Sequence, residues 1–222
     1  MVKPLLDSLD IDGIVITADA LLTQKEIAKY LVEEKRAHYH FTVKGNQKTL
    51  LENIQLFFKC KEEPDASTVD MGHGRIETRR IWVTSSLNNY LNFPHVKQVF
   101  AIERESINKK TGVVSKEIAY GITSQCELDA SPMKVLQTNR GHWCIENSCH
   151  YILDWVYDED RCRIRTGYGP ENISRIRRFA ISVIKSISSK GVTETTRDLA
   201  MNVRLVFDYL KMTRNTRADL AG

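Results

Sequence analysis

The sequence has 222 residues, of which 42% are hydrophobic and 27% are charged, and its formal net charge is +4. This composition is ordinary for a soluble globular protein, and the length suits one large domain or two small ones. No apolar run approaches the ~20 residues that a membrane helix needs, so we expect no membrane partner. The mildly basic charge permits a nucleic-acid partner without requiring one.

Two features of the chain favour a reduced, cytoplasmic protein. The N-terminal residues MVKPLLDSLDID lack the apolar core of a signal peptide. The five cysteines are odd in number, are scattered along the chain and form no C-x-x-C pair. Free thiols in the cytoplasm are the simplest interpretation of this pattern.

The first part of the chain alternates between strand and helix patterns. Residues 13–18, GIVITA, form a short β-branched run that is typical of a buried strand, and the run ends at Asp19. A helix is predicted at about 24–35, HYHFTV predicts a second strand, and apolar spacing over 50–58 predicts a second helix. This β-α-β-α order favours a sheet with helices on its faces.

The pattern changes after the loop-like stretch KEEPDAS. Three strand candidates follow, RIETRRIWVT, KQVFAIERES and EIAYGITS, and the last two are joined by the hairpin-like loop NKKTG. The segment from about 65 to 125 is therefore predicted to be rich in β-structure.

The remainder of the chain is predicted to be helical. Ser131 and Pro132 suit the first positions of one helix, and GPEN begins another. A last helix is predicted after Thr196. The helix after GPEN has an apolar stripe with a period of 3.6 residues, made by Ile173, Ile176, Ala180, Val183, Ile184 and Ile187.

Residues 140–150, RGHWCIENSCH, concentrate histidines, cysteines and a glutamate. The spacing H-x-C-x₄-C-H does not match that of structural zinc sites, so we expect no zinc. On a helix, His142, Glu146 and His150 share one face. Glu146 is then either a partly buried carboxylate that needs a partner or a metal, or a surface glutamate paired with Arg140 or His150.

The next segment, DWVYDEDRCRIR, sets an acidic run directly before three arginines. One interpretation is a solvated loop whose charges pair with one another. The other is a basic finger that contacts phosphate groups. Composition alone does not separate these two interpretations.

Several blocks of the sequence resemble one protein family. RGHWCIENSCHYILDWVYDEDRCRIRTGYGPENISRIRRFA is similar to the C-terminal part of DDE-type bacterial insertion-sequence transposases of the H-repeat-associated group. VITADALLTQKEIAKYL, HYHFTVKGNQKTL and GHGRIETRRIWVT match three further blocks of that group in the same order. The resemblance extends from about residue 11 to about residue 187.

The resemblance implies an α/β fold with a ribonuclease-H-like core, a β-rich insertion at about 65–125 and C-terminal helices. It implies metal-dependent cleavage and transfer of DNA strands, in which three acidic residues hold Mg²⁺ or Mn²⁺. Asp19 corresponds to the second acid and Glu146 to the third. Hard cations prefer carboxylate oxygens as ligands, and a pair of them can activate the attacking oxygen and stabilise the leaving oxygen of a phosphodiester exchange.

DNA is the partner implied by the resemblance, and a homo-oligomer is compatible with it. Residues expected to contact DNA follow the second strand, flank Glu146 or lie in the basic finger: Lys44, Asn46, Gln47, Arg140, His142, Arg163 and Arg165. Many related transposases have arginine and tyrosine where this chain has His142 and Asn139, although the H-repeat group shares the histidine.

The first acid of the family lies in a DGK-like block that is absent from these 222 residues. We therefore expect residues 1–222 to be the C-terminal part of a catalytic domain, truncated at the N-terminus and inactive by itself in metal-dependent DNA cleavage. The alternative is a DNA-binding or interaction remnant without catalytic activity.

Overall fold

The computed structural model describes residues 2–60, 63–72, 74–143 and 151–213. The chain divides into two compact units, Met1–His142 and Trp143–Gly222.

The first unit is a mixed α/β fold. Its elements are, in chain order, α1 (Val2–Asp7), β1 (Val15–Ala18), the 3₁₀ turn η1 (Ala20–Leu22), α2 (Lys25–Lys29), the π-helix η2 (Tyr30–Glu34), β2 (His38–Val43), the 3₁₀ turn η3 (Gly45–Gln47), α3 (Lys48–Phe58), β3 (Ala66–Gly72), β4 (Arg75–Thr84), β5 (Gln98–Asn108), β6 (Val114–Thr123) and α4 (Pro132–His142). The helix predicted at about 24–35 is confirmed, as α2 continued by η2.

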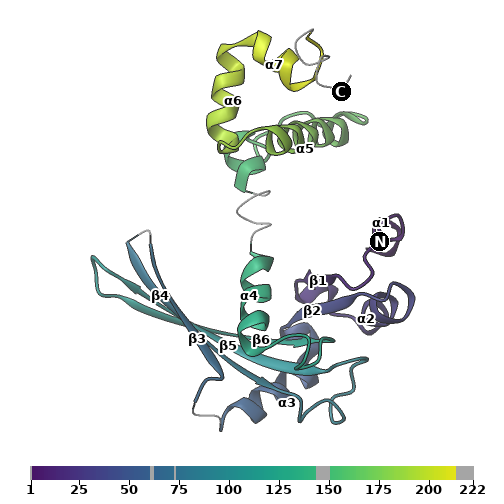
Figure 1. The fold of residues 1–222 in the computed structure, drawn as a ribbon, viewed down its shortest axis with the longest axis vertical. Helices are drawn as coiled ribbons and strands as arrows, with labels where there is room; N and C mark the ends of the chain where they lie inside the picture. The colour runs from purple at the N-terminus through teal and green to yellow at the C-terminus, as the bar shows by residue number, and fades with distance from the viewer. Residues whose placement is uncertain (1, 61–62, 73, 144–150, 214–222) are drawn as a thin grey trace. The chain divides into compact units, whose positions relative to one another are not determined.

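One curled sheet of six strands organises this unit, in the order β1-β2-β6-β5-β4-β3 (Figure 1). β1 and β2 are parallel, whereas every other neighbouring pair is antiparallel. The three strands predicted after the loop are confirmed as β4, β5 and β6. They join the same sheet as the first two strands, because β6 pairs directly with β2.

β3 is a strand that the sequence analysis missed. Its sequence, ASTVDMG, contains aspartate and glycine, which are both depleted in strands. Pairing with β4 stabilises this strand despite its low β-propensity. β3 is in register with β4 along its whole length, from Ala66 opposite Ile81 to Gly72 opposite Arg75.

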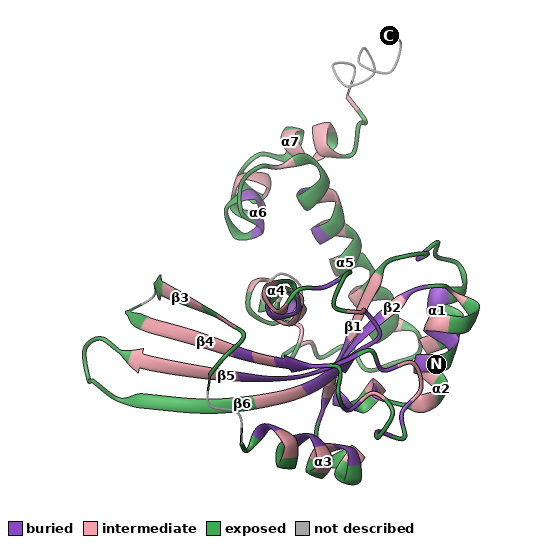
Figure 2. Ribbon diagram, turned by 60° about the horizontal axis from the view of Figure 1, so that its bottom comes forward, coloured by how far each residue is buried: buried purple, intermediate pink, exposed green. Residues whose placement is uncertain are grey.

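Two helices cover opposite faces of the sheet (Figure 2). α3 packs on β5 and β6, and α4 packs on β4, β1 and β3. Because successive side chains of a strand point to opposite faces, the strands contribute core residues beneath both helices. On the α3 side the core includes Tyr39, Phe41 and Ile54, and on the α4 side it includes Phe100 and Leu136.

The outer halves of β3 to β6 extend beyond both helices and carry charged side chains instead of a core. Cross-strand ion pairs join Arg80 to Glu103 at 2.7 Å and Lys116 to Glu105 at 3.0 Å. Such partly exposed pairs contribute only ~0.2–1 kcal/mol each. Their main consequence is a polar surface on an otherwise regular sheet.

The second unit is helical in its described part. Its elements are the π-helix η5 (Ile152–Val156), α5 (Gly169–Ile187), α6 (Val192–Met201) and α7 (Val203–Tyr209). Leu153, Ile181, Ile184 and Val192 form its core.

The apolar stripe lies on α5, where Ile184 is enclosed and Ile176 is 60% exposed. One sequence prediction for this unit needs correction. The last predicted helix begins earlier, at Val192, and is two helices. The break falls at Asn202, whose extended backbone ends α6 and whose side chain accepts a hydrogen bond from Leu205 N to cap α7.

A glycine sets the spacing of the sheet under α4. A Cβ atom at Gly121 would lie 2.1 Å from Cζ of Phe100 and 2.6 Å from the backbone oxygen of Phe41. The Phe100 ring also stacks on His40, with the ring centres 4.5 Å apart. Only glycine at this position lets the two rings close over the sheet.

We predict that Gly121→Ala lowers the free energy of unfolding by about 1–3 kcal/mol, because the added methyl overpacks a site walled by a rigid backbone oxygen. Gly141→Ala is the matched control. No atom of the described residues lies within 4 Å of its new Cβ, and alanine in an exposed helix should stabilise by up to about 1 kcal/mol. Urea denaturation of both variants decides this, and equal effects would contradict the packing argument.

Candidate functional site

The candidate site lies where β1 and β2 end. Because the two strands are parallel, their carboxyl ends meet at the same edge of the sheet. Asp19 directly follows β1, and Lys44 directly follows β2. Lys44 Nζ lies 3.3 Å from Oδ1 of Asp19, and both side chains are about two-thirds exposed.

The Asp19 carboxylate is held in its ionised form. Its Oδ1 accepts a hydrogen bond from the backbone N–H of Ala20 at 2.7 Å. This bond lowers the pKa of Asp19 most, and the positive charges of Lys44 and His142 add to it, whereas partial burial opposes them. Among the described residues, none hydrogen-bonds Oδ2 of Asp19. Within the described part of the chain, the ionised carboxylate therefore keeps one oxygen without a partner at neutral pH.

Asn46 and Gln47 hold the loop that carries Asp19. The side-chain amide of Asn46 donates to the backbone oxygen of Ala20 at 2.6 Å, and that of Gln47 donates to Thr23 O at 2.9 Å. Thr23 Oγ1 in turn donates to Thr42 O at 2.7 Å. The structure thus gives the two amides a positioning role, and their predicted contact with DNA stays a prediction.

The last turn of α4 is attached to the first two strands. His142 Nδ1 lies 3.1 Å from Oγ1 of Thr17, and Asn139 Nδ2 lies 3.5 Å from Nε2 of His40. Thr17 and His40 are register partners on the α4 face of the sheet. The two contacts fix the end of α4 beside the strand that leads into Asp19.

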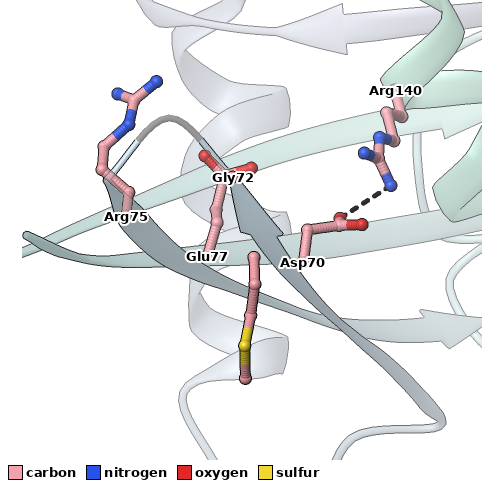
Figure 3. Close-up of a pocket in the computed structure, with 6 residues that line it drawn as sticks. Asp70, Gly72, Arg75, Glu77 and Arg140 are labelled. Atoms are coloured by element: carbon pink, nitrogen blue, oxygen red, sulfur yellow. Dashed lines mark ion pairs between the residues drawn. The ribbon is translucent and has the colours of Figure 1, made fainter. Parts of the chain in front are cut away.

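Arg140 points into a different feature, a cavity of about 250 Å³ at the outer part of the sheet (Figure 3). Its Nη1 lies 2.7 Å from Oδ2 of Asp70, which also contacts Arg79 at 3.1 Å. Arg75 and Glu77 line the same cavity. A phosphate at Arg140 would have to compete with the Asp70 carboxylate.

The other predicted site residues lie in the second unit or outside the described residues. Glu146 and the rest of 144–150 are not described. Arg163 and Arg165 are exposed, and Arg165 Nη1 donates to Ile164 O at 3.2 Å. Arg161 pairs with Asp158 at 3.6 Å, as the solvated-loop interpretation predicts for this segment. Among residues 2–60, 63–72, 74–143 and 151–213, the structure contains no cluster of three acidic, histidine or cysteine side chains that could hold a metal ion.

Thr17 and His40 were not among the site residues predicted from the sequence. A signal for them existed, since residues two apart on a strand share a face. Thr17 therefore lies on the same side of β1 as Asp19, and His40, its register partner, lies on that side of β2. The parallel register was not available from the residues alone.

Comparison with known proteins identifies the family. Residues 1–179 match the family described as "Transposase DDE domain", and this segment includes both Asp19 and Glu146. The chain belongs to this family. The resemblance on which the sequence analysis relied is confirmed.

Three curated relatives extend the match to the H-repeat group. The chain is 32% identical over 214 residues to "Putative protein YbfL" of Escherichia coli K12, and 31% identical over 214 residues to "H repeat-associated putative transposase YhhI" of the same strain; each alignment covers 90% of the chain. It is 30% identical over 222 residues to "Putative transposase YncI" of E. coli O157:H7, covering 94% of the chain. The chain spans 56% of the length of each relative.

Within this DDE-domain chain, none of the described helices combines the length and hydropathy needed to cross a membrane.

His40 beside this site is almost completely enclosed. Burial against Phe100, together with the positive charge of nearby His142, lowers the pKa of His40 to about 3. The folded protein therefore holds His40 neutral, whereas the unfolded chain protonates it near pH 6.5.

We predict that stability falls as the pH drops from about 6.5 towards 3, because the unfolded chain binds this proton before the folded protein does. Replacing His40 by glutamine removes the titrating group, so the variant should lose less stability than the wild type over the same range. Urea unfolding at pH 7.5 and pH 4.5 measures the difference. Identical pH dependence in the two proteins would show that His40 is not the group responsible.

Proposed function

We propose that this chain carries the catalytic face of a transposase that cleaves and transfers DNA strands with divalent metal ions during transposition of an insertion sequence. The core is ribonuclease-H-like, and β3 to β6 constitute a β-rich insertion between the two acids. Of the metal ligands, this chain supplies Asp19 and Glu146. Membership of the DDE-domain family supports the proposal, and the geometry at Asp19 carries it.

The chemistry of Asp19 fits a hard cation. An ionised carboxylate at the end of a parallel strand, with Oδ2 open, is the kind of oxygen donor that Mg²⁺ and Mn²⁺ prefer. Bound in a pair, such ions activate an attacking oxygen and stabilise a leaving one in phosphodiester exchange. The backbone N–H of Ala20 and the ammonium of Lys44 hold Oδ1 in place.

The assignment of Glu146 to the same site rests on the match to the DDE-domain family. Glu146 follows the end of α4 by four residues in the sequence. The contacts of His142 with Thr17 and of Asn139 with His40 fix the point at which the chain leaves the sheet.

DNA is the proposed substrate, and its phosphates are met by basic side chains around the site. Lys44 pairs with Asp19 through an exposed contact of 3.3 Å, and we expect a DNA phosphate to compete with the carboxylate for it. Arg140 and His142 in the last turn of α4, and Arg163 and Arg165 in the second unit, are the other proposed phosphate contacts. Arg140 is already paired with Asp70, so a DNA phosphate would have to displace the Asp70 carboxylate to bind Arg140.

We predict that Mn²⁺ binds to the 222-residue chain and that Asp19→Asn weakens binding by about tenfold or more. The physical reason is that an amide removes the negative charge and offers the cation a weaker donor. Glu146→Gln should weaken binding to a similar extent. Electron paramagnetic resonance of free Mn²⁺ during a titration measures all three affinities.

Glu52→Gln is the control, because Glu52 is an exposed carboxylate on α3 that pairs only loosely with Lys48, at 4.0 Å. It should leave the Mn²⁺ affinity unchanged. Equal Mn²⁺ affinity in the wild type and in Asp19→Asn would count against the metal site. If DNA were still bound in that case, the non-catalytic DNA-binding alternative would be favoured instead.

A further inference from the structure

The second unit contains a small cavity, lined by both charged and apolar side chains, that the proposed metal site does not use. It has a volume of about 180 Å³ and lies between the loop before α5 and the first turns of that helix. That volume far exceeds the ~30 Å³ that one water occupies in the liquid. The side chains that matter at its wall are those of Glu159, Cys162, Ile164, Arg165, Ile173 and Arg177.

Arg177, which lines this cavity, has a guanidinium nitrogen without a hydrogen-bond acceptor among the described residues. Its Nη1 atom is buried and has no hydrogen-bond partner in the part of the chain that the structure describes. A guanidinium group is always charged and can only donate, so a buried N–H of this kind lacks an acceptor. Leaving such a donor unpaired is unfavourable, and a small turn of the guanidinium group towards an anion in the cavity would satisfy it.

The charges around the cavity also favour an anion. Arg165 lies at the same wall, and its Nη1 is engaged by Ile164 O at 3.2 Å. Glu159 is the single acidic side chain among the described lining residues, so the two guanidinium groups outnumber it. Paired guanidinium groups match the oxygens of a phosphate better than lysines do.

We propose that this cavity binds a phosphate group of the DNA backbone, with Arg177 as the buried anchor and Arg165 as the outer contact. The assignment of DNA as the source of the phosphate rests on the function proposed above. Arg163, two residues before Arg165, is not among the described residues that line the cavity. The basic finger is thus given one defined phosphate position instead of a diffuse positive surface.

Cys162 provides a reporter inside the cavity. Its thiol is partly buried at the cavity wall, whereas Cys60 is exposed and lies in the other unit. A phosphate bound between Arg165 and Arg177 would cover Cys162 and slow its alkylation. Cys60 would react at an unchanged rate and serves as the internal reference.

The test measures alkylation by iodoacetamide at each cysteine by mass spectrometry, in buffer without phosphate. Three samples of the full chain are compared: alone, with a short DNA duplex at low salt, and with inorganic phosphate. We expect the duplex to slow alkylation of Cys162 several-fold relative to Cys60. Inorganic phosphate should do so only at much higher concentration, since one phosphate lacks the other contacts of the duplex.

Arg177→Gln should abolish the protection of Cys162 and reduce the salt slope of DNA binding by about 1, as expected for the loss of one phosphate contact. Arg178→Gln is the matched control, because it removes the same charge from the neighbouring, exposed position on α5. It should leave the protection intact. Thermal unfolding of both variants checks the fold, and Arg177→Gln should not be less stable, since it removes an unpaired donor.

The outcomes separate the two proposals. If the duplex binds but Cys162 is unprotected and Arg177→Gln has no effect, the cavity proposal is wrong and the proposed function stands. Protection by inorganic phosphate but not by DNA would overturn the assignment to the DNA backbone. A wild-type chain that binds no DNA at low salt would contradict the proposed function itself.

Discussion

The parallel pairing of β1 with β2 is the constraint on which the candidate site depends. It brings the residues that follow each strand to one edge, so that Asp19 and Lys44 meet although they are 25 positions apart. It also sets Thr17 beside His40 on the face that α4 covers. In another strand register, the Asp19 carboxylate would be separated from the Lys44 ammonium. The end of α4 would also lose its contacts with Thr17 and His40.

Packing under α4 carries that arrangement into the rest of the sheet. His40 stacks on Phe100, and Phe100 fits only because residue 121 has no side chain. The antiparallel strands β4 and β5 thereby contribute core residues beneath α4. Their outer halves carry ion pairs and a polar cavity at Arg140, where exposed charges contribute little stability but remain available to a ligand.

The sequence was most informative where local patterns and the final structure agree. Alternating apolar residues located β4, β5 and β6, and the run GIVITA predicted the strand that ends at Asp19. β3 escaped because its stability comes from pairing with β4, and the break at Asn202 escaped because a cap interrupts an unbroken apolar pattern. The tasks of Asn46 and Gln47 were also hidden, since both depend on where the Asp19 loop lies.

The central claim is that Asp19 and Glu146 share one metal site, and iron-directed cleavage of the polypeptide tests it most directly. Fe²⁺ replaces Mg²⁺ in the full chain, and ascorbate with peroxide then generates radicals that cut the backbone near the bound ion. The account predicts cuts beside residue 19 and beside residue 146, both suppressed by excess Mg²⁺ and both lost in Asp19→Asn. Cuts at only one of these two segments, or cuts that persist in the variant, would contradict it.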